Sequence, residues 1–332
     1  MLNIKKQYRG KIVLVTGGAG CVGSNLVKEL SDIGAKKVII LDNLSSAYRW
    51  NIPEGRNIVF VEGDVRDDET LKRVFKEKPE YVFHLAAHFA NQNSVDNPET
   101  NLMVNGMGTL KVLEYSQLSG IKRFVFASSG CGVYGLDSRM PFKEEDISIQ
   151  LHTPYQVTKL LGELYTNYFN NLYGLPTVNA RFFNVFGPGE VPGKYRNVIP
   201  NFFYWAMQGK SLPITGNGSE TRDWTYVGDI VNGLLAMGIV KEAIGEAINL
   251  GSGKETKVIE MAKMINKITG NKNGIKYIER RNWDVKKRIL SSIGKAKKLL
   301  NYQPKTGFRE GLGAVYKWFI ENEENIKKSA EF

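Results

Sequence analysis

The sequence predicts an α/β protein in which a doubly wound parallel sheet is followed by a smaller C-terminal α/β domain that holds substrate. Short apolar runs rich in Val, Ile and Phe alternate with amphipathic stretches of helical spacing through the first half of the chain. Each run ends in a turn rich in Gly, Ser or Asn. Such β-α repetition gives parallel strands with helices on both faces, and the strands are continuously apolar because both faces are buried.

Six apolar runs are the predicted strands of this sheet, at residues 12–15, 38–41, 58–61, 81–85, 124–127 and 177–182. A helix is predicted between the last two, because Thr153 can cap it, Pro154 suits its first turn and Gly174 suits its exit. Two further helices are predicted near residues 256–269 and 308–322.

The sequence pattern changes after about residue 184, where turn-rich segments such as "NVFGPGEVPGKYRNVIPNF" begin. Polar groups spaced between apolar anchors are typical of a substrate domain. We therefore predict one domain from residues 1–183, to which 224–250 return, and a second from 184–223 and 251–332.

Composition limits the classes of function. The 332 residues carry a net charge of +11 and two cysteines, Cys21 and Cys131. The lysines are scattered, so we expect a solvated basic surface that attracts an anionic substrate, and no nucleic-acid interface. Apolar runs are too short for a membrane span, and the N-terminus lacks the layout of a signal peptide. From these two observations we expect a cytoplasmic protein with no membrane partner. Two cysteines are too few for a disulfide framework and no metal-ligand spacing is present, so we expect reduced thiols and no metal.

A glycine-rich turn, "VTGGAGCVGS", follows the first predicted strand, with Gly17, Gly20 and Gly23 at intervals of three. The turn needs backbone freedom, a phosphate needs close backbone approach, and the next helix needs tight packing on the sheet. Amides at the helix start then face a pyrophosphate. Asp42 closes the second strand, where its carboxylate can bind a ribose 2′-hydroxyl and would repel a 2′-phosphate. The first domain is therefore predicted to be a Rossmann-type site for NAD rather than NADP.

Tyr155 and Lys159 are four residues apart, on one face of the predicted helix. A nearby ammonium favours the phenolate and lowers the pKa of the tyrosine, and the positive nicotinamide ring would lower it further. Such a tyrosine can take a proton from a sugar hydroxyl while a hydride leaves the same carbon. Because this pair follows an NAD site in the same chain, we predict that it is catalytic.

These motifs, with "DNLSS", "GDV", "HLAA", "SSGCGVYG", "RFFNVFGPG" and "TRDWTYVGDI", resemble the extended short-chain dehydrogenase/reductase family, and within it the nucleotide-sugar epimerase and dehydratase branch. The resemblance implies transient oxidation of a nucleoside-diphosphate sugar by tightly held NAD. It also implies a homodimer built on two helices per subunit, one of which carries Tyr155 and Lys159. The residues that it assigns to NAD are Gly17, Gly20, Cys21, Val22, Gly23, Asp42, Asn43, Asp64, Val65, Leu85, Ala86, Ala87, Tyr155 and Lys159.

Asp64 has two interpretations at this stage. It follows the third predicted strand, where its carboxylate can reach the adenine of the dinucleotide. It can equally be the N-cap of the next helix, and the two roles are compatible.

The loop "SSGCGVYG" departs from the family pattern, in which its third position supplies a catalytic hydroxyl to the sugar. That position is Gly130 here, so Ser129 is the candidate if the loop is reshaped, and Ser128 is a weaker one. Both serines could instead satisfy backbone groups or touch the cofactor. Cys131 and Gly132 follow, where dehydratases of this branch carry Asp-Glu and decarboxylating relatives carry Glu at the second position. Dehydration and decarboxylation are therefore disfavoured, and we expect Cys131 to fill a loop pocket.

The resemblance also implies the residues that hold the nucleotide sugar. These are Asn184 on a phosphate or sugar oxygen, Asn197 and Val198 on the pyrophosphate and base, and Arg222 and Arg281 on the diphosphate. Ser129 joins them as the candidate that replaces the hydroxyl absent at Gly130. Arg280 competes with Arg281 for its register. The position that gates 2-acetamido sugars falls on Arg288 or Ile289.

The predicted function is NAD-dependent epimerisation at C4 of a nucleotide sugar, with a UDP-hexose favoured in its glucose/galactose, N-acetyl or uronic form. C4 epimerisation needs a hydride transfer, rotation of the 4-keto sugar and return of the hydride. The absent hydroxyl at Gly130 motivates an alternative, a 4-dehydrogenase that releases a keto sugar. A dehydratase, a 3,5-epimerase and a non-catalytic NAD sensor are less favoured, the last because Tyr155 and Lys159 are intact.

Overall fold

The main sheet of the computed structural model has seven parallel strands in the order β11-β6-β5-β4-β1-β2-β3. The structure describes residues 4–136, 138–280, 284 and 286–332. The order reverses at β1 and β4, so the predicted doubly wound, Rossmann-type sheet is confirmed, and its switch point lies at the carboxyl ends of these strands. The strands are β1 (Ile12–Thr16), β2 (Lys37–Asp42), β3 (Ile58–Glu62), β4 (Tyr81–His84), β5 (Arg123–Ser129), β6 (Thr177–Phe182) and β11 (Ala247–Leu250).

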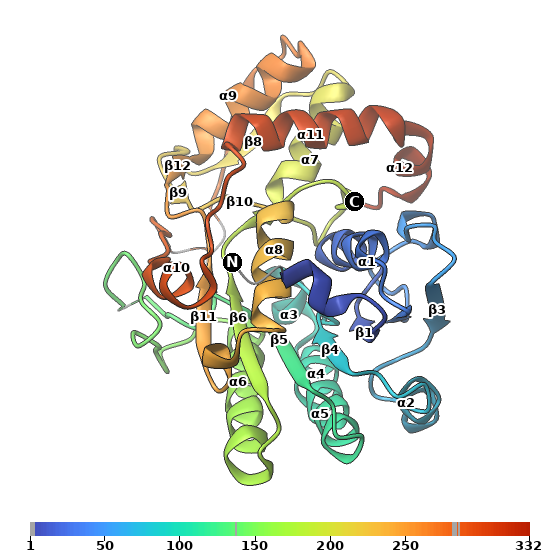
Figure 1. Ribbon diagram of the computed structural model, residues 1–332. Helices are drawn as coiled ribbons and strands as arrows, with labels where there is room; N and C mark the ends of the chain where they lie inside the picture. The colour runs from blue at the N-terminus through green and yellow to red at the C-terminus, as the bar shows by residue number, and fades with distance from the viewer. Residues whose placement is uncertain (1–3, 137, 281–283, 285) are drawn as a thin grey trace.

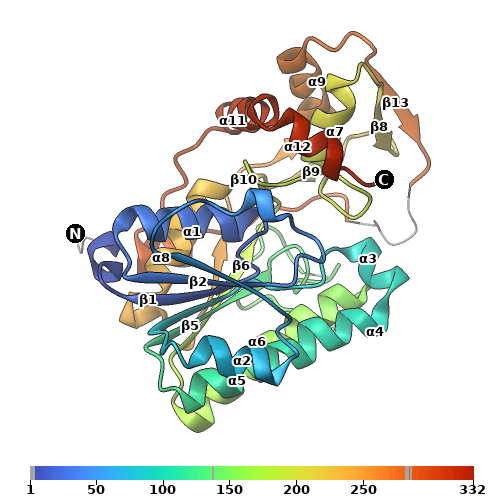
Figure 2. The ribbon, with the colours of Figure 1, turned by 90° about the vertical axis from the view of Figure 1, so that its right-hand side faces the viewer.

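Helices cover both faces of this sheet (Figure 2). The helices α1 (Cys21–Ile33), α8 (Val227–Met237) and α10 (Gly294–Leu300) pack on one face, over a core of Val, Ile and Leu from the strands. On the other face lie α2 (Asp68–Phe75), α5 (Thr109–Leu118) and α6 (Pro154–Tyr173), over a second apolar core. Burial on both faces explains why the strands are apolar throughout.

The helix α6 begins and ends as predicted. Thr153 caps it by accepting a hydrogen bond from the amide of Gln156, and Gly174 ends it in the left-handed conformation with φ of 66°. Beside α6 runs a continuous helical segment made of α4 (Pro98–Asn101), the π-helical stretch η3 (Leu102–Gly108) and α5, preceded by α3 (Asn91–Asp96).

The remaining chain builds a smaller layer above the carboxyl ends of the strands (Figures 1 and 2). Its core joins aromatic and aliphatic side chains of its helices. Its elements are β7 (Val185–Phe186), α7 (Val198–Met207), β8 (Leu212–Thr215), β9 (Thr221–Arg222), β10 (Thr225–Tyr226), β12 (Thr256–Lys257), α9 (Val258–Thr269), β13 (Ile275–Ile278), α11 (Phe308–Glu321) and α12 (Glu323–Ser329). Three short 3-10 helices, η1 (Ile4–Tyr8), η2 (Arg49–Asn51) and η4 (Lys241–Ala243), complete the described elements.

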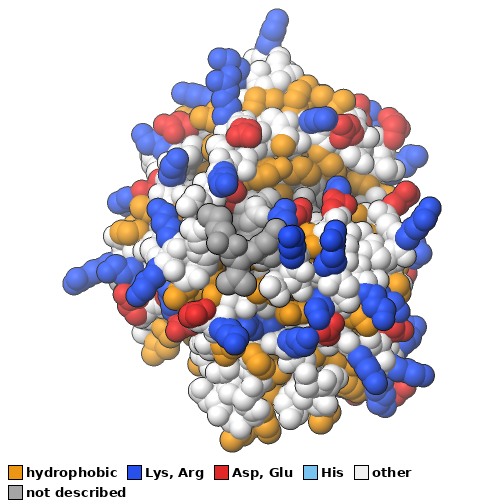
Figure 3. All heavy atoms as spheres, in the orientation of Figure 1, with side chains coloured by type: hydrophobic (Ala, Val, Ile, Leu, Met, Phe, Trp, Pro, Cys, Tyr) orange, Lys and Arg blue, Asp and Glu red, His pale blue; other side chains and the backbone are white. Residues whose placement is uncertain are grey.

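Charges are spread over the surface. On the face in Figure 3, Lys and Arg side chains are distributed among acidic ones and do not gather into one stripe. Among the residues described, no helix is both long and apolar enough to cross a membrane.

The close approach of α6 to β5 places the site. Gly162 lies so near the strand that a Cβ there would be 2.2 Å from Cζ of Phe126. A helix residue with a side chain at this position would push α6 away from the sheet, and Lys159 is one turn earlier on the same helix.

We expect Gly162→Ala to destabilise the protein by roughly 1–3 kcal/mol, because overpacking a close contact forces a backbone shift. Gly313→Ala is the matched control, since a Cβ there meets nothing within 4 Å on α11. That change should stabilise the protein by up to about 1 kcal/mol through helix propensity. Urea unfolding followed by circular dichroism measures both, and equal effects would contradict the packing argument.

Candidate functional site

A cavity of about 610 Å³ opens at the carboxyl ends of the parallel strands, under the smaller layer. Every predicted site residue that the structure describes lines it. These residues are Gly17, Gly20, Cys21, Val22, Gly23, Asp42, Asn43, Asp64, Val65, Leu85, Ala86, Ala87, Ser129, Tyr155, Lys159, Asn184, Asn197, Val198 and Arg222. Arg281 lies outside the described residues.

The glycine-rich turn has the geometry that a dinucleotide needs. Gly17 adopts φ of +71°, and a Cβ there would be 2.6 Å from the amide nitrogen of Ala86. A Cβ on Gly23 would be 2.1 Å from the carbonyl oxygen of Gly17. Only glycines allow this turn to lie flat against β4 and α1, which leaves the amides at the start of α1 facing the cavity.

Asp42 holds the turn from the end of β2. Its two carboxylate oxygens accept hydrogen bonds from the amides of Ala19 at 3.0 Å and Leu44 at 2.9 Å. Burial raises the pKa of this carboxyl, and the two amide donors oppose the shift. The carboxylate is thus fixed at the cavity wall, where it can still accept bonds from ribose hydroxyls.

Asp64 is not a helix N-cap, so that interpretation is wrong. The helix α2 starts after Asp67, whose carboxylate accepts the amide of Thr70 at 2.9 Å. Asp64 instead accepts bonds from Arg66 Nε at 2.9 Å and Asn43 Nδ2 at 2.8 Å. The hydrogen bonds from Arg66 are the largest cause that lowers the pKa of Asp64, which keeps it ionised at the cavity edge.

Tyr155 and Lys159 both face the cavity from α6. The ammonium of Lys159 is 5.6 Å from the ring centroid of Tyr155 and donates a hydrogen bond to the carbonyl of Ala127 at 2.8 Å. Burial lowers the pKa of Lys159 to about 7. Burial also raises the pKa of Tyr155 well above its usual value, and the thiol of Cys131 adds to the shift.

The expected lowering of the Tyr155 pKa by Lys159 is therefore wrong for the protein alone. The ammonium is bound to a carbonyl, and desolvation of the phenol dominates. A positive charge delivered next to the phenol, such as a nicotinamide ring, acts in the opposite direction.

The loop after β5 explains the missing hydroxyl. A Cβ on Gly130 would be 2.1 Å from Cε2 of Phe183, so this position has no room for a side chain. Ser128 and Ser129 both line the cavity, and the hydroxyl of Ser128 donates to Glu163, which lies outside the lining. No hydrogen bond of the Ser129 hydroxyl occurs within the described chain. Cys131 packs against Asn184, whose side-chain oxygen accepts from its thiol at 3.2 Å.

The opposite wall carries the predicted substrate residues. Asn197 stands at the N-cap position of α7, but its side chain makes no cap hydrogen bond, and its amide group donates to Glu190 at 2.7 Å. Arg222 donates to the carboxylate of Asp284 at 3.3 Å. Arg280, the competitor for the Arg281 register, is paired with Glu220.

Only one of the two candidates for the position that gates 2-acetamido sugars lines the cavity. Ile289 lines the cavity. Arg288 forms an ion pair with Glu255 at 2.6 Å and does not line the cavity.

Two charged residues of this wall, Glu190 and Lys286, carry no sequence signal that predicts them. Glu190 is 7% exposed, one of its oxygens has no hydrogen-bond partner among the described residues, and burial raises its pKa to about 7. The ammonium of Lys286 donates to the carbonyl of Cys131 at 2.9 Å. Both lie in segments without helical or strand periodicity, so only the folded chain brings them to the cavity.

The fold and the cavity together define a nicotinamide-dinucleotide enzyme of the extended short-chain dehydrogenase/reductase type. The sequence profile of the NAD dependent epimerase/dehydratase family matches residues 13–251. A solved epimerase from the methanogen Methanothermobacter thermautotrophicus is 72% identical with a TM-score of 0.99, over 100% of this chain and 98% of that one.

Two curated relatives act on different sugars. UDP-glucose 4-epimerase of Mycolicibacterium smegmatis is 33% identical over 92% of this chain and 97% of its own. UDP-glucuronate 4-epimerase of Thermodesulfobacterium geofontis is 34% identical over 95% and 98%. The chain thus belongs to the NAD dependent epimerase/dehydratase family: it is an epimerase, and its cofactor is NAD.

The raised pKa of Glu190 predicts a pH dependence of stability. Between its ordinary value of 4.5 and about 7, the folded protein keeps a proton on Glu190 that the unfolded chain releases. The free energy of unfolding should therefore fall as pH rises through this window. Glu190→Gln should remove that fall, so the variant gains roughly 1–3 kcal/mol on wild type between about pH 5 and about pH 8.

Urea unfolding of both proteins at these two pH values measures the effect. Glu54→Gln, at an exposed carboxylate, is the control and should leave the pH dependence as in wild type. A parallel pH response of wild type and Glu190→Gln would refute a titrating Glu190.

Proposed function

We propose that this chain interconverts the C4 epimers of a UDP-hexose through a transient 4-keto sugar. The observation that carries the proposal is one continuous cavity whose lining brings together the glycine-rich turn, Asp42, Tyr155, Asn197 and Arg222. Such a cavity suits two diphosphate compounds that meet at the phenol. Relatives that act on UDP-glucose and UDP-glucuronate support a UDP-sugar as the substrate class.

Gly17, Gly20 and Gly23 would hold the pyrophosphate of NAD, and Asp42 its ribose. Bound NAD would supply a reversible hydride acceptor for the sugar carbon. Tyr155 takes the proton of the C4 hydroxyl and gives it back to the oxygen of the 4-keto sugar. Lys159 places a hydrogen-bond donor beside this phenol, and Ser129 offers its hydroxyl to the same sugar oxygen.

The loop after β5 favours epimerisation over elimination of water. Loss of water needs, in addition to the tyrosine, an acid and a base close to the sugar. Cys131 and Gly132 occupy the two positions in question, and burial raises the pKa of the Cys131 thiol. Neither residue supplies a carboxylic acid, so the proton traffic is left to Tyr155.

The diphosphate of the sugar nucleotide would lie at the start of α7. Asn197 and Val198 begin this helix, and the amides of the first turn of a helix attract an anion. Arg222 and Asn184 line the cavity nearby and supply further donors.

We also propose that two copies of the chain pair through η3 and α6. Large apolar side chains stand exposed on these neighbouring helices, and a face of this kind needs a cover in water. They are Leu102, Met103, Met107, Val157, Leu164 and Tyr168. A second copy can present the same apolar face, so a symmetric contact buries both.

Tyr155→Phe should lower kcat for epimerisation at least about 10²-fold, because the proton of the C4 hydroxyl loses its acceptor. NAD content and thermal stability should stay near those of wild type. The assay offers UDP-glucose, UDP-glucuronate and UDP-N-acetylglucosamine in turn, and follows product isomers by NMR and NADH by absorbance. Wild-type turnover by Tyr155→Phe would contradict the mechanism.

The same assay separates the alternatives in wild type. A C4 epimer without net NADH supports the epimerase. Accumulation of NADH with a keto sugar would replace the proposal with a 4-dehydrogenase, and binding of NAD without any conversion would replace it with a sensor.

Leu164→Glu should convert the dimer into a monomer, since a charge in an apolar contact is left unpaired. Leu164 is 55% exposed in the single chain, so the variant should still fold. Ile320→Glu is the control, because Ile320 is 53% exposed on α11, away from η3 and α6. Light scattering measures both masses; an unchanged mass for Leu164→Glu would rule out this interface.

A further inference from the structure

A buried ion pair lies behind the cavity, on the α6 side of the sheet. Glu163 of α6 and Arg181 of β6 each have 4% of their side chain exposed. Arg181 donates from Nε at 2.8 Å to one carboxylate oxygen and from Nη2 at 2.7 Å to the other. This bidentate pair has no atom in the cavity lining, so the chemistry proposed above does not use it.

The pair holds the start of the loop at residues 128–134. Ser128 lies opposite Arg181 in the register of β5 and β6, and its hydroxyl donates to Glu163. Successive side chains of a strand point to opposite faces. Ser128 itself borders the cavity, and its hydroxyl is held by Glu163, so the side chain of the next residue, Ser129, is directed to the other face.

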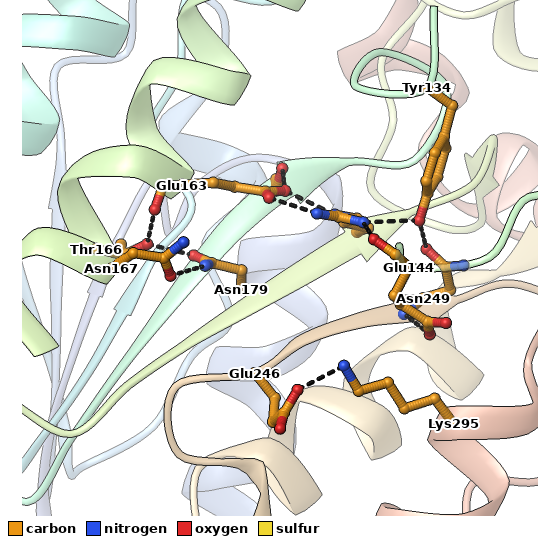
Figure 4. A network of polar contacts seen from close by, with 11 residues as sticks. Tyr134, Glu144, Glu163, Thr166, Asn167, Asn179, Glu246, Asn249 and Lys295 are labelled. Carbon is orange, nitrogen blue, oxygen red and sulfur yellow. Dashed lines mark hydrogen bonds and ion pairs between the residues drawn. The ribbon is translucent and has the colours of Figure 1, made fainter. Parts of the chain in front are cut away.

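The same pair holds the end of the 128–134 loop (Figure 4). Through Nη1, Arg181 donates to the hydroxyl of Tyr134 at 2.9 Å and to the carbonyl of Glu144 at 2.7 Å. The hydroxyl of Tyr134 in turn donates to the side chain of Asn249 on β11. Between these two anchors lie Gly130, Cys131 and Gly132, the unusual part of the loop.

The pair also connects the loop to the catalytic helix. Tyr155, Lys159 and Glu163 occupy successive turns of α6. One helix thus carries the phenol, the ammonium and the carboxylate that anchors the loop. Burying two charges costs more than packing apolar side chains of the same volume, so stability alone gives no reason for the pair.

We propose that Glu163 and Arg181 are positioning residues that hold both ends of the 128–134 loop, and so set Ser129 against Tyr155 and Lys159. The proposal rests on the function proposed above for its effect on turnover. Its effect on the loop itself stands apart from that function, and the two are tested separately.

Two single variants test the effect on turnover. Ser128→Ala removes one anchor and leaves the ion pair, and Glu163→Gln keeps the shape but removes the charge. Each should lower kcat roughly 10- to 100-fold, as expected for a misplaced catalytic group, while KM and NAD content change less than about threefold. Asp229→Asn is the matched control: this buried carboxylate of α8 accepts the amides of Lys305 at 3.0 Å and Thr306 at 3.1 Å, outside the cavity.

Asp229→Asn should lower Tm and leave kcat as in wild type. Wild-type kcat in both Ser128→Ala and Glu163→Gln would overturn the proposal. Should Glu163→Gln fail to fold, Ser128→Ala decides by itself.

A double variant separates positioning from stability. Glu163→Met with Arg181→Leu replaces the pair by apolar side chains, which should restore Tm relative to Glu163→Gln. If the pair positions the loop, kcat stays low in this stable protein. Full recovery of kcat together with Tm would overturn the proposal, because it would leave the pair a purely structural role.

The conformation of the 128–134 loop can also be tested without measuring enzyme activity. Cys131 sits between the two anchors, and Cys21 is the only other cysteine of the sequence. Iodoacetamide labelling followed by peptide mass spectrometry should show Cys131 reacting at least about fivefold faster in Ser128→Ala and Glu163→Gln, relative to Cys21 as internal reference. An unchanged Cys131 rate in both variants would overturn the proposal. If wild type converts no sugar, the proposed function fails, and this labelling still decides on the loop.

Discussion

The contact of α6 with β5 is the constraint on which the site depends. Gly162 lets the helix lie against the ring of Phe126, and one turn earlier the ammonium of Lys159 reaches the carbonyl of Ala127 at the end of the strand. Tyr155 is then carried to the carboxyl edge of the sheet, where the cavity opens. The same edge collects the glycine-rich turn, since the carboxyl ends of parallel strands meet there.

The loop after β5 shows how one steric contact redirects chemistry. Phe183 occupies the space where a side chain at Gly130 would point, so we propose that the hydroxyl for the sugar comes one residue earlier, from Ser129. Ser129 can replace the missing hydroxyl only if the 128–134 loop holds it in a defined position relative to Tyr155. Glu163 and Arg181 supply that hold from behind, through Ser128 and Tyr134.

Burial, more than pairing, sets the charges around the cavity. It lowers the pKa of Lys159 and raises those of Tyr155 and Glu190, which moves each group toward its neutral form in the protein alone. Charged ligands alter this balance, because two diphosphates and a positive ring enter the same low-dielectric space. The protonation states of Lys159, Tyr155 and Glu190 in the protein alone therefore differ from those expected when charged ligands are bound.

The sequence by itself determined the parallel sheet, the NAD site and the Tyr155–Lys159 helix. Hydrophobic period, glycine spacing and capping residues are local properties, and each is complete within about 20 residues. Local signals also explain the errors. Asp64 and Asp67 are both residues of a type that can cap a helix, and only the structure shows that Asp67 caps α2 while Asp64 binds Arg66 and Asn43.

Only the tertiary structure decided which hydroxyl faces the cavity, which way the pKa values move, and which buried charges support the loop. Ser128 meets Glu163 across 35 positions of chain, and Phe183, directly after β6, lies where a side chain on Gly130 would point. Glu190 and Lys286 reach the cavity from segments without periodicity. Contacts between distant segments and the loss of water around a side chain are properties of the packed chain, because no single stretch of sequence contains both partners.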